Sequence, residues 1–99
     1  MTLADAKARL AGLTFVNYAH AQGNGDLLIS RAGTQSCEYE QGWTFAEVSA
    51  VADALGCADI DIAAVVASYV DDLPMQRWRD GCDTCGYGDT LIVRGILTA

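Results

Sequence analysis

The first pattern of hydrophobic and polar positions in the chain is that of a short helix over residues 2–12. Thr2 can cap the N-terminus of this helix, and Gly12 can end it. Asp5 falls in the first turn, where a negative charge interacts favourably with the positive end of the helix dipole. We therefore expect a helix at the start of the chain.

The pattern then changes to that of two strands, over 15–21 and 27–32, on either side of the turn-forming residues 23–26. Residues 36–40 can form a third short strand. In the alternative interpretation, the first helix continues to Gln22 and replaces the first strand. Both interpretations stay open at the level of the sequence.

The best-defined predicted element is a helix over 44–56. Thr44 and Glu47 have the spacing of a capping box, in which Thr44 caps the helix and Glu47 reaches back to the amide of Thr44. Gly56 provides the C-terminal stop. Apolar side chains follow at helical spacing between these two ends: Phe45, Val48, Ala52 and Leu55.

A second helix is predicted over 61–72, ending before Pro74. Its middle, residues 62–67, is apolar on nearly every side, which indicates a centrally buried helix. The β-branched residues in this stretch leave a strand as the alternative.

The C-terminal part is expected to form a β-hairpin, with strands over 75–79 and 90–97 and a glycine-rich loop over 80–89 between them. The predicted elements are a short N-terminal helix, a small antiparallel sheet, a helix-turn-helix-like pair (about 44–56 and 61–72) and this hairpin. Their order predicts an α+β fold.

The 99 residues fit a single domain, 1–99, because the chain is too short for two hydrophobic cores. No stretch approaches the ~18 consecutive apolar residues of a membrane span, and the first residues lack the layout of a signal peptide. We therefore expect a cytoplasmic protein with no membrane partner. In that compartment, the four cysteines are expected to be thiols or metal ligands rather than disulfides.

The net charge of −7 is unevenly distributed, because no Lys or Arg lies between Arg31 and Arg77. Such a surface repels phosphate backbones, so direct nucleic-acid binding is not expected. The charge has two interpretations: solubility of a small acidic protein, or an acidic face that docks on a partner. The interval holds eight acidic residues: Glu38, Glu40, Glu47, Asp53, Asp59, Asp61, Asp71 and Asp72.

Residues 48–65 resemble the helix-turn-helix pattern, with Ala52 at the small position of the first helix and Gly56 at the tight turn. The packing positions are apolar: Val51, Leu55, Cys57, Ile62 and Val65. The resemblance implies a helical hairpin, followed by a β-hairpin that can serve as a wing. It also implies DNA binding, but we do not carry that role over, because groove reading needs cations or amides. The corresponding positions hold Ala58, Asp59, Ile60, Asp61, Ala63 and Ala64.

Residues 82–87 resemble the metal-binding knuckle of rubredoxins and zinc ribbons. The resemblance implies that Cys82 and Cys85 chelate one zinc ion. Further ligands would have to come from residues at unusual spacing: Cys37, Cys57 and His20. In the alternative, the cysteines at 37 and 57 are small buried core residues and the protein has no cofactor. A thioredoxin-like redox role is not favoured, because the CxxC of that family opens a helix after a strand.

The sequence does not predict an enzyme. His20 is the only histidine, and a lone histidine is more often a surface or packing residue than a general base. No Ser, Thr or Cys lies in a nucleophile motif, and no phosphate-cradling glycine loop opens a helix. Trp43 and Trp78 flank the helical pair, where they can anchor a partner.

We expect a small acidic, non-enzymatic protein-binding module that acts as an inhibitor or adaptor by docking on the basic surface of a nucleic-acid-handling protein. In size and charge it resembles anti-CRISPRs and other phage anti-defence proteins, DNA mimics, antitoxins and immunity proteins, without a shared motif. Asp71 and Asp72 fall at the C-terminus of the predicted second helix, where the helix dipole disfavours a carboxylate by ~0.3–1 kcal/mol unless it is solvated. Such departures from a local rule are expected more often at functional sites, so the two residues support the docking interpretation. The expected docking residues are Glu47, Asp53, Asp59, Asp61, Asp71, Asp72 and Trp78.

Two other classes of function stay open. One is a structural or regulatory zinc knuckle that works through Cys82 and Cys85. The other is a degenerate transcription-factor fragment that works through dimerisation. The sequence also leaves the oligomeric state open, a homo-oligomer included.

The capping box predicts the effect of one substitution. Thr44→Ala is expected to lower the free energy of unfolding by about 1 kcal/mol, because it removes the acceptor for an amide in the first turn of the helix. Urea denaturation of the variant and the wild type measures the difference. An unchanged midpoint would mean that the helix begins at another residue.

Overall fold

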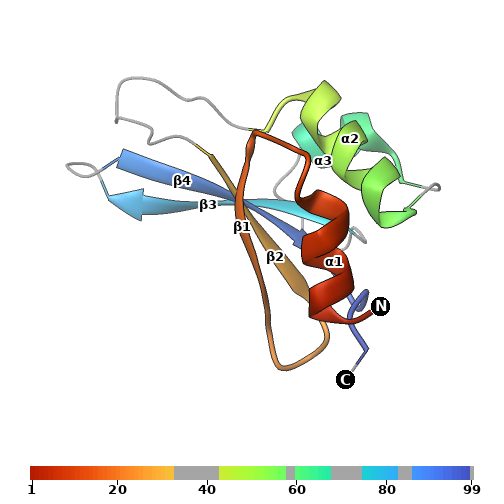
Figure 1. The fold of residues 1–99 in the computed structure, drawn as a ribbon. Helices are drawn as coiled ribbons and strands as arrows, with labels where there is room; N and C mark the ends of the chain where they lie inside the picture. The colour runs from red at the N-terminus through yellow and green to blue at the C-terminus, as the bar shows by residue number, and fades with distance from the viewer. Residues whose placement is uncertain (33–42, 58–59, 68–74, 83–85, 99) are drawn as a thin grey trace.

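The computed structural model describes residues 1–32, 43–57, 60–67, 75–82 and 86–98. Their architecture is the predicted α+β fold, in which helices α1, α2 and α3 pack on an antiparallel sheet of strands β1 to β4 (Figure 1). The expected third strand over 36–40 lies outside the described residues.

Helix α1 spans Leu3–Leu10, and Thr2 caps it as predicted. The Thr2 hydroxyl accepts a hydrogen bond from the Asp5 amide at 3.2 Å, and the Asp5 carboxylate accepts one from the Thr2 amide at 3.3 Å. The C-cap is Ala11, so the helix ends before Gly12. The alternative of a helix that continues to Gln22 is wrong, because the chain turns after Leu10 and enters β1 (Val16–Ala21).

Helix α2 spans Phe45–Leu55 and has both of the predicted ends. The Thr44 hydroxyl accepts from the Glu47 amide at 3.2 Å, and the Glu47 carboxylate accepts from the Thr44 amide at 3.0 Å. Gly56 adopts the left-handed conformation with φ +73°, which a glycine reaches without steric cost. The capping box therefore places the start of α2 correctly.

Helix α3 spans Ile62–Ala67, so the apolar stretch is a helix and the alternative of a strand is wrong. Asp61 precedes it and caps it, since its carboxylate accepts a hydrogen bond from the Ala64 amide at 3.2 Å. The predicted continuation to residue 72 lies outside the described residues. Helices α2 and α3 contact each other, as expected of a helical pair.

The strand order of the sheet is β1-β2-β4-β3, with all neighbours antiparallel. Strand β2 spans Leu27–Arg31, β3 spans Met75–Cys82 and β4 spans Gly86–Val93. Because β4 pairs with both β2 and β3, the C-terminal hairpin is part of the main sheet rather than a separate wing.

The predicted boundaries of this hairpin are wrong in two respects. Residues 80–82 and 86–89 belong to strands, although their glycines favour a loop locally, because each pairs across the hairpin. The second strand also ends at Val93 instead of Leu97. Gly95 adopts φ +65°, which an extended strand does not allow, so the chain turns there.

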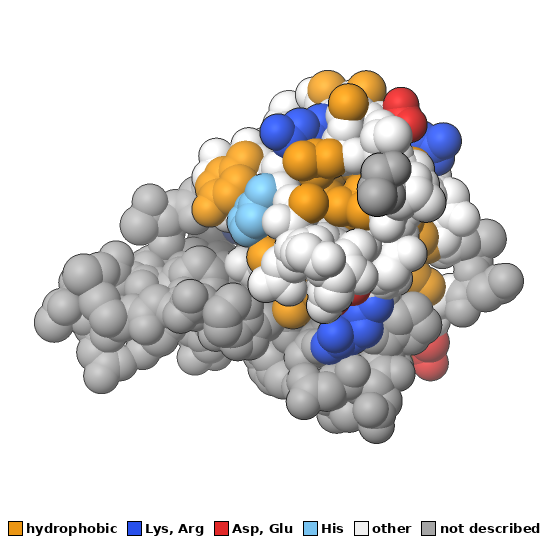
Figure 2. Space-filling model, turned by 90° about the horizontal axis from the view of Figure 1, so that it is seen from below, with side chains coloured by type: hydrophobic (Ala, Val, Ile, Leu, Met, Phe, Trp, Pro, Cys, Tyr) orange, Lys and Arg blue, Asp and Glu red, His pale blue; other side chains and the backbone are white. Residues whose placement is uncertain are grey.

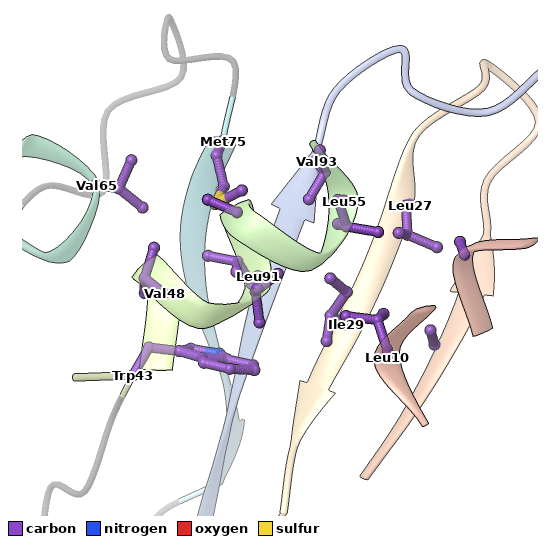
Figure 3. Close-up of a cluster of buried hydrophobic side chains, with 14 residues drawn as sticks. Leu10, Leu27, Ile29, Trp43, Val48, Leu55, Val65, Met75, Leu91 and Val93 are labelled. Atoms are coloured by element: carbon purple, nitrogen blue, oxygen red, sulfur yellow. The ribbon is translucent and has the colours of Figure 1, made fainter. Parts of the chain in front are cut away.

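The hydrophobic core lies between the helices and one face of the sheet (Figure 3). Leu27 and Ile29 of β2 and Leu91 of β4 are fully buried, and Val48 and Val51 of α2 pack against them. Burial of one such side chain contributes about 1.5–3 kcal/mol. Trp43 is 1% exposed and belongs to this core, with its ring edge-to-face against Phe15 at 6.1 Å. It therefore cannot anchor a partner, contrary to the expectation from the sequence.

A buried carboxylate fastens the C-terminal segment to the β1–β2 turn. Asp26 is 6% exposed, and it accepts hydrogen bonds from the Gly95 amide at 2.8 Å and from the Asn24 side chain at 3.1 Å. The Arg94 guanidinium lies 3.8 Å from the same carboxylate. One side chain thus satisfies polar groups from two parts of the chain that are far apart in sequence.

The C-terminal segment continues from this point to the N-terminus. The Leu97 amide donates to the Gly25 carbonyl at 2.9 Å, and the Met1 ammonium donates to the Ile96 carbonyl at 3.1 Å. The Thr98 amide donates to the Met1 carbonyl at 2.8 Å. The two termini therefore lie side by side (Figure 1).

The role of Asp26 can be tested by substitution. Asp26→Ala is expected to lower the free energy of unfolding by about 1–3 kcal/mol, because the Gly95 amide loses its acceptor. Asp26→Asn keeps an acceptor but places an amide next to the Asn24 amide, so its effect should be intermediate. Urea denaturation measures both. If Asp26→Ala were as stable as the wild type, the contact would not hold the C-terminal segment.

Candidate acidic docking surface

The predicted acidic face centres on helices α2 and α3, and the structure describes three of its carboxylates. Glu47 and Asp53 are on α2, and Asp61 caps α3. The remaining acidic residues of the interval lie outside the described residues: Glu38, Glu40, Asp59, Asp71 and Asp72.

Glu47 is bound to the protein itself. Its two carboxylate oxygens accept hydrogen bonds from Nε and Nη2 of Arg31, at 3.0 and 3.1 Å. The side chains of Arg31 and Glu47 are only 16% and 15% exposed. This two-point pair connects the end of β2 to the first turn of α2 and neutralises both charges. No local sequence pattern predicts this pair, because its partners are 16 residues apart and lie on different elements.

The environment of Glu47 changes the acidity of its carboxyl group. Burial alone would raise the pKa of Glu47, but hydrogen bonds from Arg31 and from the Thr44 amide, together with the charge of Arg31, outweigh it. The net result is a lowered pKa. Glu47 therefore stays ionised as part of the fold and contributes little free charge to a docking surface.

Asp53 and Asp61 are exposed. Asp61 uses one carboxylate oxygen to cap α3, at 3.2 Å from the Ala64 amide. Asp53 lies in the last turn of α2. The pair of helices thus presents two carboxylates to solvent, which can accept hydrogen bonds from arginine or lysine side chains of a partner.

Basic side chains of the described part lie on other elements or are paired. Lys7 and Arg9 are on α1, and Arg94 follows β4. The Arg9 guanidinium approaches Gly56 at the C-terminal end of α2, where a cation interacts favourably with the helix dipole. The positive charge nearest to the start of α2 is that of Arg31, which is bound to Glu47.

Trp78, the predicted aromatic docking residue, lies in β3, with its Cα opposite that of Thr90. β3 is an edge strand of the sheet and contacts α3. The structure therefore places Trp78 on the strand next to the helical pair.

The candidate zinc ligands are distributed over the fold. Cys82 is the last residue of β3, opposite Gly86 in the hairpin, whereas Cys85 and Cys37 lie outside the described residues. Cys57 is partly buried against the core, and burial raises the pKa of its thiol, which disfavours the thiolate that binds zinc. Within the described ranges, no group of three or more His, Cys, Asp or Glu residues is placed to hold a metal ion.

His20 cannot join Cys82 in one site. His20 lies on β1 and Cys82 on β3, which are the opposite edges of the four-strand sheet. Three strand spacings of ~4.8 Å separate these edges by about 14 Å, whereas two ligands of one ion lie within a few ångströms of each other. Instead, the His20 ring is stacked on Tyr18, with 5.5 Å between the ring centres.

No protein-family model matches the chain, and neither the curated proteins nor the solved structures compared with it include a match. Among the described residues, no helix has the length and apolar character needed to cross a bilayer.

The Arg31–Glu47 pair predicts a dependence of stability on pH. The pKa of Glu47 is lowered in the folded protein, so its stabilising effect is complete above the ordinary glutamate pKa of about 4.3 and is lost as the pH falls through the folded value. Glu47→Gln should lower the free energy of unfolding at pH 7 by about 1–2 kcal/mol and weaken the loss on acidification. Urea denaturation between about pH 3 and 7 measures both effects.

Asp5 provides the control for this measurement. Hydrogen bonding with the Thr2 side chain and with the Thr2 amide lowers the pKa of Asp5, but its carboxylate is fully exposed in the first turn of α1. Asp5→Asn should therefore change the pH profile less than Glu47→Gln. An identical profile for the two variants would contradict a stabilising role of the ion pair.

Proposed function

We propose that this protein is a small, non-enzymatic binding module that docks the acidic surface of α2 and α3 onto a basic surface of another protein, as an inhibitor or adaptor. The observation that supports it most is the exposure of Asp53 and Asp61 on a helical pair at whose start the cation Arg31 is neutralised by Glu47. Glu47 is left out of the proposed docking residues for the same reason.

The charge pattern favours a partner with clustered arginine and lysine side chains. Complementary fields accelerate the encounter of two proteins and reject partners of the wrong sign. Proteins that handle nucleic acids carry such basic surfaces, because they bind phosphate backbones. The proposed target class is therefore a nucleic-acid-handling protein, and duplex DNA itself is not a ligand.

A second candidate function, the zinc knuckle, is supported by the position of Cys82. The register of β3 and β4 pairs Cys82 with Gly86, so the CxxC motif begins at the last residue of β3. Two thiolates three residues apart at such a position can chelate one zinc ion. In this alternative, the hairpin end is the working part and the acidic surface serves solubility.

Two sets of variants distinguish these functions, measured against a partner that is first captured from the native host and identified. For acidic docking, the double variant Asp53→Asn and Asp61→Asn should slow association, because it removes two exposed charges while Asn can still cap α3. Adding Asp59→Asn, Asp71→Asn and Asp72→Asn should slow it further. Wild-type binding should weaken steeply toward a few hundred millimolar salt, where the Debye length falls below ~6 Å.

Asp5→Asn is the matched control, because it removes the same charge from an exposed position on α1. For the zinc knuckle, Cys82→Ser with Cys85→Ser, or a chelator, should abolish binding, while the Asp variants should have no effect. If the Asp variants bind as fast and as tightly as the wild type, acidic docking is wrong.

A further inference from the structure

The outer side of β1 borders a hollow of about 330 Å³ between that strand and α1. Leu10, Leu13 and Val16 provide apolar lining, and Lys7 lies among the lining residues on α1. Figure 2 shows this region of the surface, where apolar side chains lie between the single histidine and a basic side chain. The volume is at the low end of ligand pockets, enough for one or two side chains.

β1 is an edge strand, and among the described strands only β2 pairs with it. The Gln22 amide donates to the Asp26 carbonyl at 2.9 Å, which makes Gln22 and Asp26 a hydrogen-bonded pair of the antiparallel ladder. Such pairs alternate, so the next ones are those of His20 and Tyr18. The N–H and C=O groups of Ala19 and Ala21 therefore point away from β2, toward the outer edge.

β1 lacks the features that normally prevent an edge strand from pairing. Residues 16–21 include no charged side chain and no proline, and the two residues with outward backbone groups are alanines. The other edge strand, β3, carries Arg77, Arg79 and Asp80 in its sequence, which is the usual protection. A register shift between Val16 and Tyr18 interrupts β1 at one end but leaves 18–21 regular.

A strand added beside β1 would have two faces. On the side of α1, its alternate side chains would enter the hollow lined by Leu10, Leu13 and Val16. On the opposite side, its remaining side chains would lie along Tyr18, which is 55% exposed and stacked on His20. The backbone groups of Ala19 and Ala21 would provide the hydrogen bonds, as in other cases of strand addition.

The positive charge of Lys7 at the hollow indicates which chemical group a bound strand would place there. Lys7 is exposed at its border, and none of the lining residues is acidic. A second copy of this chain offers no carboxylate through the same strand, because residues 10–25 contain neither Asp nor Glu. A peptide with a carboxylate next to an apolar side chain complements both the lysine and the hollow.

We propose that the outer edge of β1 and the adjoining hollow bind an extended peptide segment of another protein by strand addition. The segment places an apolar side chain in the hollow and the carboxylate of an acidic side chain on Lys7. This site differs in position and in charge from the acidic surface of α2 and α3, and it does not depend on that surface having a partner.

The proposal is tested with three synthetic eight-residue peptides of alternating threonine and valine with one central leucine. The first carries a glutamate and an amidated end, the second a glutamine and a free C-terminal carboxylate, and the third a glutamine and an amidated end. Titration of each peptide into the ¹⁵N-labelled full chain at low salt should shift the amide resonances of Ala19 and Ala21. The glutamate peptide should bind about threefold to fivefold more tightly than the neutral one.

Two variant pairs identify the contacts. Lys7→Glu should remove the preference for the carboxylate, whereas Arg9→Glu, which changes the net charge equally but does not line the hollow, should retain it. Ala21→Pro should abolish binding because it deletes an outward N–H, and Ala21→Val should preserve it. The amide spectrum of each variant shows whether it folds, and the Lys7 pair tests the proposal independently of the proline variant.

Several outcomes would overturn the proposal. These are no change of the amide resonances at millimolar peptide, changes at β3 instead of β1, and equal binding of all three peptides. Tighter binding of the C-terminal carboxylate peptide alone, or equal effects of Lys7→Glu and Arg9→Glu, would also contradict it. Concentration-dependent shifts of the Ala19 and Ala21 amides without peptide would show that a second copy occupies the edge, which also contradicts it. A carboxylate preference that is lost only in Lys7→Glu, with binding lost only in Ala21→Pro, would support it.

Discussion

The ion pair between Arg31 and Glu47 holds α2 against the sheet and also determines which charges remain exposed on α2. It fixes the first turn of α2 against the end of β2, and Glu47 is also the residue that completes the cap of α2. Because the pair is largely buried, loss of either partner would leave an unpaired charge in a poorly solvated place. The same pair neutralises Arg31, so no unpaired cation is left at the start of α2 among the described side chains.

The sequence predicts elements whose signals are local. The capping box at Thr44 and Glu47 and the glycine at 56 define α2 within the chain segment itself, and the structure has the same bounds. The turn-forming residues 23–26 likewise place β1 and β2 correctly, since a tight turn selects the hairpin.

The features that the sequence did not predict depend on contacts between distant residues. The glycines of β3 and β4 favour a loop locally, and only pairing across the hairpin makes the strands continuous through them. The hydrogen bond from Gly95 to Asp26 joins residues 69 positions apart, so no local pattern contains it. The prediction of Glu47 as a docking residue failed for the same reason. Its spacing from Thr44 marks it as a cap, but no local pattern shows that Arg31 binds it.

The hydrogen bonds between Met1 and residues 96 and 98 have a consequence for how this fold can be combined with others. The first and last described residues lie close together, near the hydrogen bond between Gly95 and Asp26. A fold with this geometry can be placed within a surface loop of an unrelated host protein, since the two ends of the loop need not move apart. The fold is therefore suited to insertion as a domain into a host protein whose core stays unchanged.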